Sequence, residues 1–234
     1  MAGRVFRALM RSLVAPFAIA RDEALRKSAY ALKRALHVRA IEDSADVVRA
    51  EMADALFCED RFENLDYALS LRRPGLVLEF GVYRGTTIRL IAARCPDDRI
   101  YGFDSFRGLP ERWVGSRNAS TSMDRGGALP SVPANVELVA GLFGDTLPVF
   151  LANHAGAIGF VHIDCDIYSS TREVLSALTG RLAPGSVIVF DEFFGYHGFK
   201  EHEYRAFHEF IAQSGRKFRF ASYSGAQASV VLES

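Results

Sequence analysis

The sequence predicts an α/β protein in which helices cover both faces of a mostly parallel sheet, and three observations support this prediction. From Leu76 onward, short apolar runs typical of buried strands alternate with segments that have helical periodicity. The chain has 234 residues, of which 49% are apolar, enough for one large core. The last two apolar runs are joined only by Ser224-Gly225-Ala226, too short for a crossover helix, so they should form an antiparallel hairpin.

Seven strands are expected where the short apolar runs occur. They lie near residues 76–80, 100–104, 136–140, 159–164, 186–191, 217–223 and 228–232. Thr86 to Arg94 has helical spacing, and a later helix carries Tyr204 to Ile211. Ser170 and Glu173 can form a capping box for another helix, which should stop at Pro184-Gly185. These elements describe a Rossmann-like sheet of seven strands, mostly parallel with one antiparallel strand.

The N-terminal region is predicted to be a helical arm. Residues 1–40 place apolar side chains at helical spacing between arginines and lysines, which indicates one or two amphipathic helices. Two more helices are expected at residues 44–57 and 61–71, before the stop signal Pro74-Gly75. We therefore divide the chain into an arm and cap, residues 1–73, and a sheet domain, residues 74–234. The arm can pack on the domain, join a homodimer or dock on a membrane surface, and the last is the less favoured alternative.

Charge and cysteine content limit the classes of function. Residues 1–40 carry a net charge of +7, and because the whole chain is neutral, the remainder carries −7. An acidic domain argues against nucleic acid as its ligand. Three isolated cysteines, Cys58, Cys95 and Cys165, suggest free thiols in a reducing compartment. The apolar run from Ser12 to Ala20 follows arginines, as in a signal peptide, but it is short and contains Pro16, so we expect a cytoplasmic protein.

Pairs of acidic residues follow two of the predicted strands. Phe160 to Ile163 leads into Asp164 and Asp166, and Val187 to Phe190 leads into Asp191 and Glu192. A carboxylate at the end of a buried strand is costly to desolvate. The four acids therefore indicate a bound cation, a protonated partner or a ligand rich in hydroxyl groups, and a solvated surface cluster is the alternative.

A glycine-containing turn after the strand 76–80 suggests a nucleotide site. Gly81 and Gly85 let the backbone approach a ligand near the start of the next helix, in a GxxxG pattern that lacks the first glycine pair of the dinucleotide fingerprint. Asp104 ends the second strand, where a carboxylate can accept hydrogen bonds from both ribose hydroxyls of an adenosine. This arrangement fits S-adenosylmethionine better than a dinucleotide.

Residues 107–135 form a long stretch rich in Gly, Ser, Pro and Arg that contains Trp113, the only tryptophan. Loops of this length inside a compact domain are usually functional or mobile. The stretch is interpreted as a cover over the substrate, with a plain surface insertion as the alternative.

Four motifs carry a resemblance to a known family. Residues 76–232, about two thirds of the chain, resemble a class I S-adenosylmethionine-dependent methyltransferase. Within them, the segments Glu79 to Gly85, Gly102 to Pro110, Asp145 to Pro148 and His162 to Thr171 resemble the macrocin O-methyltransferase family. The resemblance implies a divalent metal held by acids and methyl transfer to a hydroxyl, often on the sugar of a natural product.

The resemblance also implies roles for individual residues. The cofactor contacts would come from Glu79, Gly81, Tyr83, Arg84, Gly85, Thr86, Asp104 and Ser105, with Leu142 and Phe143 bordering the adenine. Asp164, Asp191 and Glu192 match the acids that bind Mg²⁺ in similar enzymes, and oxygen ligands suit such a hard cation. Glu192 departs from the Asp or Asn usual at its position. Asp166 is left open as a direct ligand, a supporting acid or a helix cap.

The base that accepts the proton of the hydroxyl is not fixed by the sequence. Catechol-type relatives place a lysine where this chain has Ile167. Asp164 or His197 could act instead, whereas His162 lies within a strand and is expected to be a packed core histidine.

We therefore expect S-adenosylmethionine-dependent, Mg²⁺-assisted O-methyl transfer to a small hydroxylated acceptor, such as a sugar or a glycosylated metabolite. Two alternatives remain at this point: a metal-dependent hydrolase or phosphoesterase that uses the same acids, and an inactive cofactor-binding partner protein.

Overall fold

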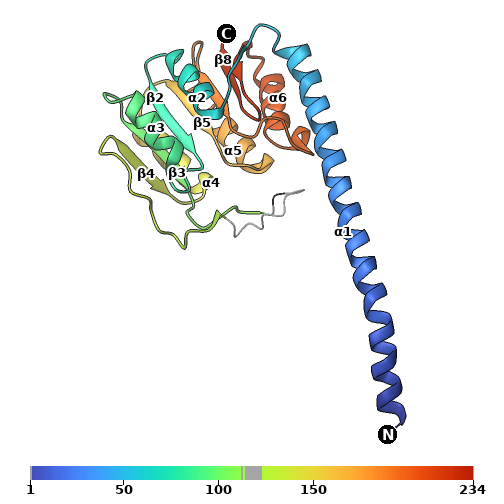
Figure 1. Ribbon diagram of the computed structural model, residues 1–234. Coiled ribbons are helices and arrows are strands. Elements are labelled where there is room, and N and C mark those ends of the chain that lie inside the picture. Colours follow the sequence, from blue (N-terminus) through green and yellow to red (C-terminus); the bar gives the residue numbers. More distant parts are fainter. Residues whose placement is uncertain (1, 112, 114–122, 234) are drawn as a thin grey trace.

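The computed structural model describes residues 2–111, 113 and 123–233, with side chains of the N-terminal helix from residue 23 onward. Within this part of the chain the core is one eight-stranded sheet in the order β1-β7-β8-β6-β5-β2-β3-β4 (Figure 1). The strands are β1 (Leu56–Phe57), β2 (Leu76–Phe80), β3 (Ile100–Asp104), β4 (Val136–Ala140), β5 (Ile158–Ile163), β6 (Val187–Phe190), β7 (Phe218–Tyr223) and β8 (Ala228–Leu232).

The predicted sheet is confirmed. β8 runs antiparallel to both β6 and β7, and the other strand pairs are parallel. The addition is β1, which pairs in parallel with β7 at the sheet edge. With only two residues, β1 is too short to show the alternation by which strands are recognised in a sequence.

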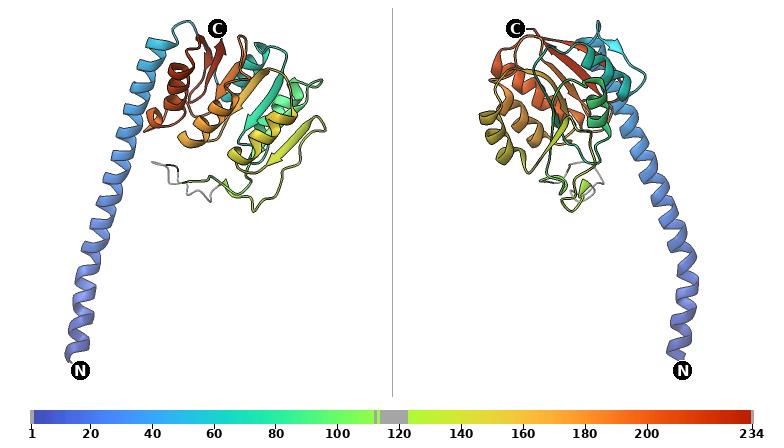
Figure 2. Two further views of the ribbon diagram at one scale, coloured as in Figure 1. Left: turned by 180° about the vertical axis from the view of Figure 1, so that it is seen from behind. Right: turned by 90° about the vertical axis from the view of Figure 1, so that its left-hand side faces the viewer.

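Helices cover both faces of the sheet, as Figure 2 shows from two further sides. They are α1 (Ala2–Glu51), α2 (Arg61–Ser70), α3 (Thr86–Arg94), α4 (Phe143–Asn153), α5 (Tyr168–Leu178), the short 3₁₀ helix η2 (Phe199–Glu201) and α6 (Glu203–Ser214). Side chains of α2 and α3 pack with Val77 and Val187 on one face of the sheet. Side chains of α4, α5 and α6 pack with Leu78 and Ile188 on the other. Because neighbouring strand residues face opposite sides, these strands are apolar throughout.

α1 is a single helix of 50 residues, and this corrects the expected division into helices within 1–40 and 44–57. It continues through Pro16 and ends at Glu51, before β1. Only its C-terminal part docks on the domain, where Ala40, Ser44 and Val47 are buried and the Ser44 hydroxyl accepts a hydrogen bond of 2.9 Å from the Gly195 amide. The rest of α1 projects away from the sheet domain (Figure 1).

The projecting part of α1 exposes large apolar side chains, among them Leu25, Tyr30 and Leu32. Among the described residues, no helix is both long enough and apolar enough to cross a membrane.

The proposed boundary between residues 73 and 74 separates elements that share the sheet. β1 is hydrogen-bonded to β7, and α2 contacts α3, β6, β7 and β8. Both elements lie within residues 1–73, so the division into arm and domain stays a prediction about sequence organisation.

Glu51, the last residue of α1, contacts two side chains of α6. These contacts lead to a prediction for Glu51→Gln. The Tyr204 hydroxyl donates to Glu51 Oε1 at 2.7 Å, and His208 Nε2 lies 3.3 Å from Oε2. Burial raises the pKa of Glu51, but the bonds with His208 and Tyr204 outweigh it, so the pKa lies below its usual value. The ionised carboxylate therefore favours the folded state above its unfolded pKa, and this contribution is lost as the pH falls through the lower folded value.

We expect Glu51→Gln to lower the free energy of unfolding by about 1 kcal/mol or less near pH 7, because the pair is only partly buried. Urea unfolding between about pH 7 and pH 3 should show the difference from the wild type shrinking as the pH falls. Glu42→Gln, an exposed acid on the same helix, is the matched control. A difference that grows on acidification would contradict this account.

Candidate functional site

A cavity of about 800 Å³ opens at the carboxyl ends of β2 to β6. In parallel strands these ends meet at one edge of the sheet, which is where α/β folds bind ligands. Residues at or just after the ends of the five strands supply much of its wall. They are Gly81, Val82, Tyr83, Arg84, Asp104, Ser105, Gly141, Leu142, Asp164, Cys165, Asp166, Asp191 and Glu192.

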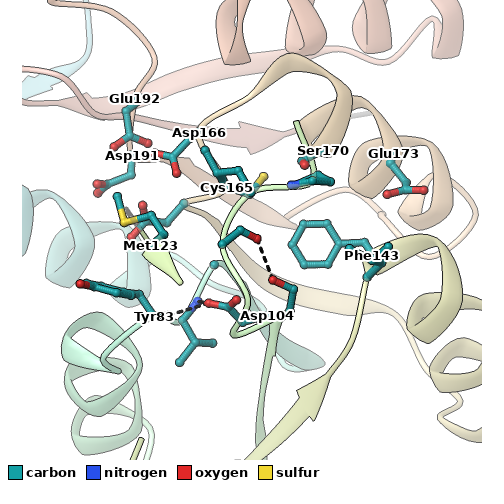
Figure 3. A pocket seen from close by; sticks show the side chains of 18 of the residues that line it. Tyr83, Asp104, Met123, Phe143, Cys165, Asp166, Ser170, Glu173, Asp191 and Glu192 are labelled. Carbon is teal, nitrogen blue, oxygen red and sulfur yellow. Dashed lines mark hydrogen bonds between the residues drawn. The ribbon is translucent and has the colours of Figure 1, made fainter. Parts of the chain in front are cut away.

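Figure 3 shows that the cavity has two chemically different ends. Asp166, Asp191 and Glu192 gather at one end, while Phe143 lies toward the other with Glu173 beyond it. Tyr83 and Asp104 lie on the side formed by the loops after β2 and β3. The cavity thus joins the predicted cofactor loop to the predicted acid cluster.

Gly81 fixes the close approach of the loops after β2 and β5. It has φ +94°, and a Cβ atom there would lie 1.7 Å from the Asp164 carbonyl oxygen. Only glycine fits such a contact, because that oxygen belongs to the backbone and cannot move aside cheaply. The neighbouring amide of Asp164 donates to the Phe80 carbonyl at 2.8 Å. The cofactor loop and the first acid of the cluster are therefore held together by backbone contacts.

The carboxylate of Asp104 organises the loops on either side of it. Its Oδ2 accepts from the amides of Val82 at 2.9 Å and Tyr83 at 2.6 Å, and its Oδ1 accepts from the Phe106 amide at 2.7 Å. A carboxylate has about four acceptor positions, so roughly one remains, on Oδ1. Asp104 lines the cavity as expected, but in this arrangement it has room for one ribose hydroxyl rather than two.

Glu79 lies beneath the cavity and does not line it. The side chain is fully buried, its Oε1 lies 2.9 Å from His162 Nδ1, and its Oε2 has no hydrogen-bond partner. On the other side of the imidazole, Nε2 lies 3.7 Å from Asp191 Oδ1. Burial lowers the pKa of His162, but the contacts with Asp191 and Glu79 outweigh it and raise the pKa to about 10. His162 is buried as expected, but it lies between the carboxylates of Glu79 and Asp191 rather than packing against apolar side chains alone.

The acids after β5 and β6 form two overlapping groups of ligand atoms, each within 4.8 Å. One group is His162, Asp164 and Asp191, and the other is Asp164, Asp166 and Glu192. Asp164 belongs to both. The predicted triad of Asp164, Asp191 and Glu192 therefore lies in one cluster, divided between two neighbouring groups.

Burial and mutual repulsion change the pKa values of these carboxyls. Burial, followed by the charge of Asp191, raises the pKa of Asp164 well above its usual value and that of Asp166 to about 7. Burial, followed by the charge of Asp164, raises the pKa of Glu192. Asp191 differs, because contacts with His162 and then Arg61 overcome its burial and lower its pKa. The cluster thus has excess negative charge that a cation would relieve.

Two further charged groups, one buried and one half-buried, complete the cluster, and no local sequence pattern predicts either of them. Glu203, the first residue of α6, is fully buried, and its Oε2 accepts from the Glu192 amide at 2.9 Å. Arg61, the first residue of α2, lines the cavity with Nη1 3.2 Å from Asp191 Oδ2 and Nη2 3.9 Å from Asp164 Oδ2. Arg61 is more than 100 residues from both partners, so only the fold brings them together.

Six of the remaining residues of the predicted site line the cavity. They are Tyr83, Arg84, Thr86, Ser105, Leu142 and Phe143. Gly85 is instead the N-cap of α3 with φ +75°. His197 is exposed, and the described lining of the cavity does not include it. The structure therefore does not bring His197 to the acid cluster.

Backbone strain is concentrated around the cavity. Among the described residues, the non-glycine residues with positive φ are Tyr83 at 47°, Phe106 at 53° and Asp166 at 65°. Such residues cluster at functional sites, where the surroundings hold an unfavourable conformation. Asp166 makes no cap bond to α5, whose N-cap is Ile167 without a side-chain bond, so the helix-cap interpretation of Asp166 and the capping box at Ser170 are both wrong.

The described part of the 107–135 segment lies against the cavity. Gly108, Leu109, Pro110 and Met123 line it, and the Ser169 hydroxyl donates to Glu111. Trp113 faces the ring of Tyr196 at 6.2 Å between ring centres. Residues 112 and 114–122 lie outside the described residues.

Comparisons with known proteins agree with this geometry. Residues 78–193, which contain the glycine turn, Asp104 and the acid cluster, match the sequence pattern of a methyltransferase-domain family. An 8-demethyl-8-(2,3-dimethoxy-α-L-rhamnosyl)-tetracenomycin-C 4′-O-methyltransferase of Streptomyces olivaceus is 31% identical over 159 residues. That match covers 57% of this chain and 60% of the relative, so it spans less than two thirds of the relative's length.

Two solved structures share the fold. The calicheamicin methyltransferase CalS11 is 25% identical, with a TM-score of 0.57 over 71% of this chain and 75% of its own. The O-methyltransferase NovP is 20% identical, with a TM-score of 0.57 over 74% and 80%. By their sequence match, residues 78–193 belong to a methyltransferase-domain family, and the mostly parallel sheet has the Rossmann-like topology of class I S-adenosylmethionine-dependent methyltransferases.

Proposed function

We propose that the protein transfers a methyl group from S-adenosylmethionine to a hydroxyl group of a small glycosylated acceptor, with the help of Mg²⁺. The observation that carries this proposal is the single cavity, which places the GxxxG turn and Asp104 beside Asp164, Asp191 and Glu192. A methyl donor and an activated hydroxyl must meet in line, and one cavity with both kinds of wall satisfies that need.

For the cofactor, we propose that the methionine end lies over Gly81, Tyr83 and Arg84 near the start of α3, because the first amides of a helix have no partner within it. Asp104 would contact the ribose through its remaining acceptor position. Leu142 and Phe143 would border the adenine, which suits apolar and aromatic surfaces. Glu79, which does not line the cavity, would influence the cofactor site indirectly, by holding His162 and by supporting the glycine turn that follows β2.

The acid cluster fits a hard divalent cation. Its cavity-facing donors are carboxylate oxygens, which suit Mg²⁺, and Glu192 Oε2 is buried without a hydrogen-bond partner. The pKa values of Asp164, Asp166 and Glu192 are raised by burial and repulsion, so a cation would stabilise their ionised forms. We propose Asp164, Asp191 and Glu192 as the residues that hold it, with Asp166 beside them.

Proton removal is the chemical step that the residues themselves must perform. When bound, a divalent ion lowers the pKa of a coordinated hydroxyl group. We assign the general base to Asp164, because it lies in the cavity and belongs to both groups of ligand atoms in the acid cluster. Exposed His197 is not used in this mechanism.

The acceptor class is proposed from the Streptomyces olivaceus relative, whose name specifies methylation of a rhamnosyl tetracenomycin. The cavity edge near the acids carries the exposed ring of Phe62 and the side chain of Met123. An apolar ring can pack on the C–H face of a sugar, while the acids receive its hydroxyl groups.

S-adenosylmethionine binding tests the cofactor assignment. Asp104→Asn replaces a carboxylate by a group with one acceptor oxygen, and its amide hydrogens would face backbone amides. We expect calorimetry to show affinity at least about tenfold lower than in the wild type. Asp97→Asn, an exposed acid before β3, should bind normally. Undiminished affinity in a folded Asp104→Asn protein would refute the assignment, and no binding to the wild type would favour a hydrolase.

Chelation tests the metal assignment. With an α-L-rhamnoside as acceptor, release of S-adenosylhomocysteine should fall by about 100-fold or more in excess chelator and return with Mg²⁺. Asp164→Asn and Asp191→Asn should each cause a comparable loss, and Asp97→Asn should not. Turnover that is indifferent to the chelator would remove the metal from the mechanism and leave methyl transfer intact.

We also propose that the projecting part of α1 joins two copies of the chain. Leu25, Ala29, Leu32 and Leu36 repeat at intervals of four, three and four residues, the spacing of helices that pack along a seam. Light scattering should show a dimer for the full chain and a monomer after deletion of residues 1–38. A monomeric full chain that sediments with anionic vesicles would instead support membrane docking.

A further inference from the structure

The guanidinium group of Arg61 lies where a divalent cation would approach the acid cluster. Nη1 is 3.2 Å from Asp191 Oδ2, and Nη2 is 3.9 Å from Asp164 Oδ2. These two aspartates are also two of the three ligands proposed for Mg²⁺. The positive charge of Arg61 therefore already neutralises part of the negative charge that a metal ion would neutralise.

The Arg61 side chain has more room to move than the two aspartates that it contacts. Asp191 and Asp164 directly follow β6 and β5, and their side chains are only 5% and 23% exposed. The Arg61 side chain is 37% exposed and lines a cavity of about 800 Å³. Its backbone is fixed, because Asp60 caps α2 by accepting from the amides of Phe62 and Glu63. The guanidinium can thus swing into the cavity while the helix and the acids stay in place.

The other acids of the cluster have no such partner. In the described part of the chain, no ion pair involves Asp166 or Glu192, and Glu192 Oε2 is buried without a hydrogen bond. His162 cannot move in the same way, because it is buried between Glu79 and Asp191. Arg61 is therefore the cation of this cluster that can leave.

We propose that Arg61 is an exchangeable counter-cation, which stabilises the acid cluster when no divalent ion is bound and is displaced from Asp191 and Asp164 when the ion binds. Like charges this close repel strongly at low effective dielectric, so the guanidinium and the ion exclude one another. The inference rests on the proposed metal assignment. By this inference, Arg61 weakens the binding of Mg²⁺ but stabilises the folded protein when no metal is bound.

The test compares the wild type with Arg61→Gln by calorimetric titration with MgCl₂ and by thermal unfolding, with and without MgCl₂. We expect Arg61→Gln to bind Mg²⁺ at least about tenfold more tightly, because no positive charge has to leave. Without Mg²⁺ it should melt at a lower temperature than the wild type, and saturating Mg²⁺ should abolish or reverse that difference. Arg61→Lys should lie between the two proteins, because it keeps the charge but not the forked contact.

Arg172→Gln is the matched control. It removes a positive charge from the wall of the same cavity, but Arg172 lies over the ring of Tyr168 and has no ion pair with Asp164 or Asp191. Its Mg²⁺ affinity should stay within about twofold of the wild type. An equal gain in both variants would assign the effect to general charge and would overturn the exchange.

The outcomes separate this inference from the proposed function. If the wild type binds Mg²⁺ and Arg61→Gln binds it equally or more weakly, the exchange is wrong while the metal site stands. If neither binds, the metal assignment fails and the exchange fails with it. Titration with S-adenosylmethionine in the same preparations reports the cofactor site separately. A melting difference that is the same with and without Mg²⁺ would show that Arg61 is merely structural.

Discussion

The feature on which this site depends is a row of alternating charges that runs through the sheet edge. The row consists of four side chains, each next to the following one in space: Glu79, His162, Asp191 and Arg61. The nearest nitrogen and oxygen atoms of successive members are 2.9, 3.7 and 3.2 Å apart. Without the two cations, Asp191 would be a buried carboxylate among other carboxylates, which is an unfavourable arrangement in a low-dielectric interior. This row of side chains begins with Glu79 in β2, the strand before the glycine turn, and ends with Arg61 in the cavity. The balance of charges and the geometry of the site are therefore coupled.

Backbone contacts reinforce this coupling. The closeness of Gly81 to the Asp164 carbonyl leaves no room for a side chain, and Asp104 holds the amides of the turn in place. Each contact joins a loop on the cofactor side to one of its neighbours. A change at Glu79 or Asp104 should therefore affect the acid cluster as well as the cofactor, although neither residue belongs to that cluster.

The sequence predicted the sheet well because its evidence is local. An apolar run of five residues between turn signals defines a strand whatever its partner, and the acids that follow it must meet at one edge if the strands are parallel. The elements that were missed depend on distant partners. β1 is defined only by its pairing with β7. The residues around Arg61 in the sequence contain no pattern that predicts its contact with Asp191. Separate helices were expected within residues 1–40 and at 44–57, whereas one helix, α1, continues to Glu51.

The row of charges also bears on the number of ions that the cluster can hold. A two-ion hydrolase holds its metals about 4 Å apart, which needs enough carboxylates to balance two divalent charges. Here Asp164 is shared by both groups of ligand atoms, and the group around Asp191 already faces His162 and Arg61. A second divalent ion would have to share Asp164 and lie beside the buried ring of His162, whose pKa is raised by its contacts with Asp191 and Glu79. The arrangement therefore favours a single ion at the proposed ligands Asp164, Asp191 and Glu192, which would leave the rest of the cavity to a donor and an acceptor.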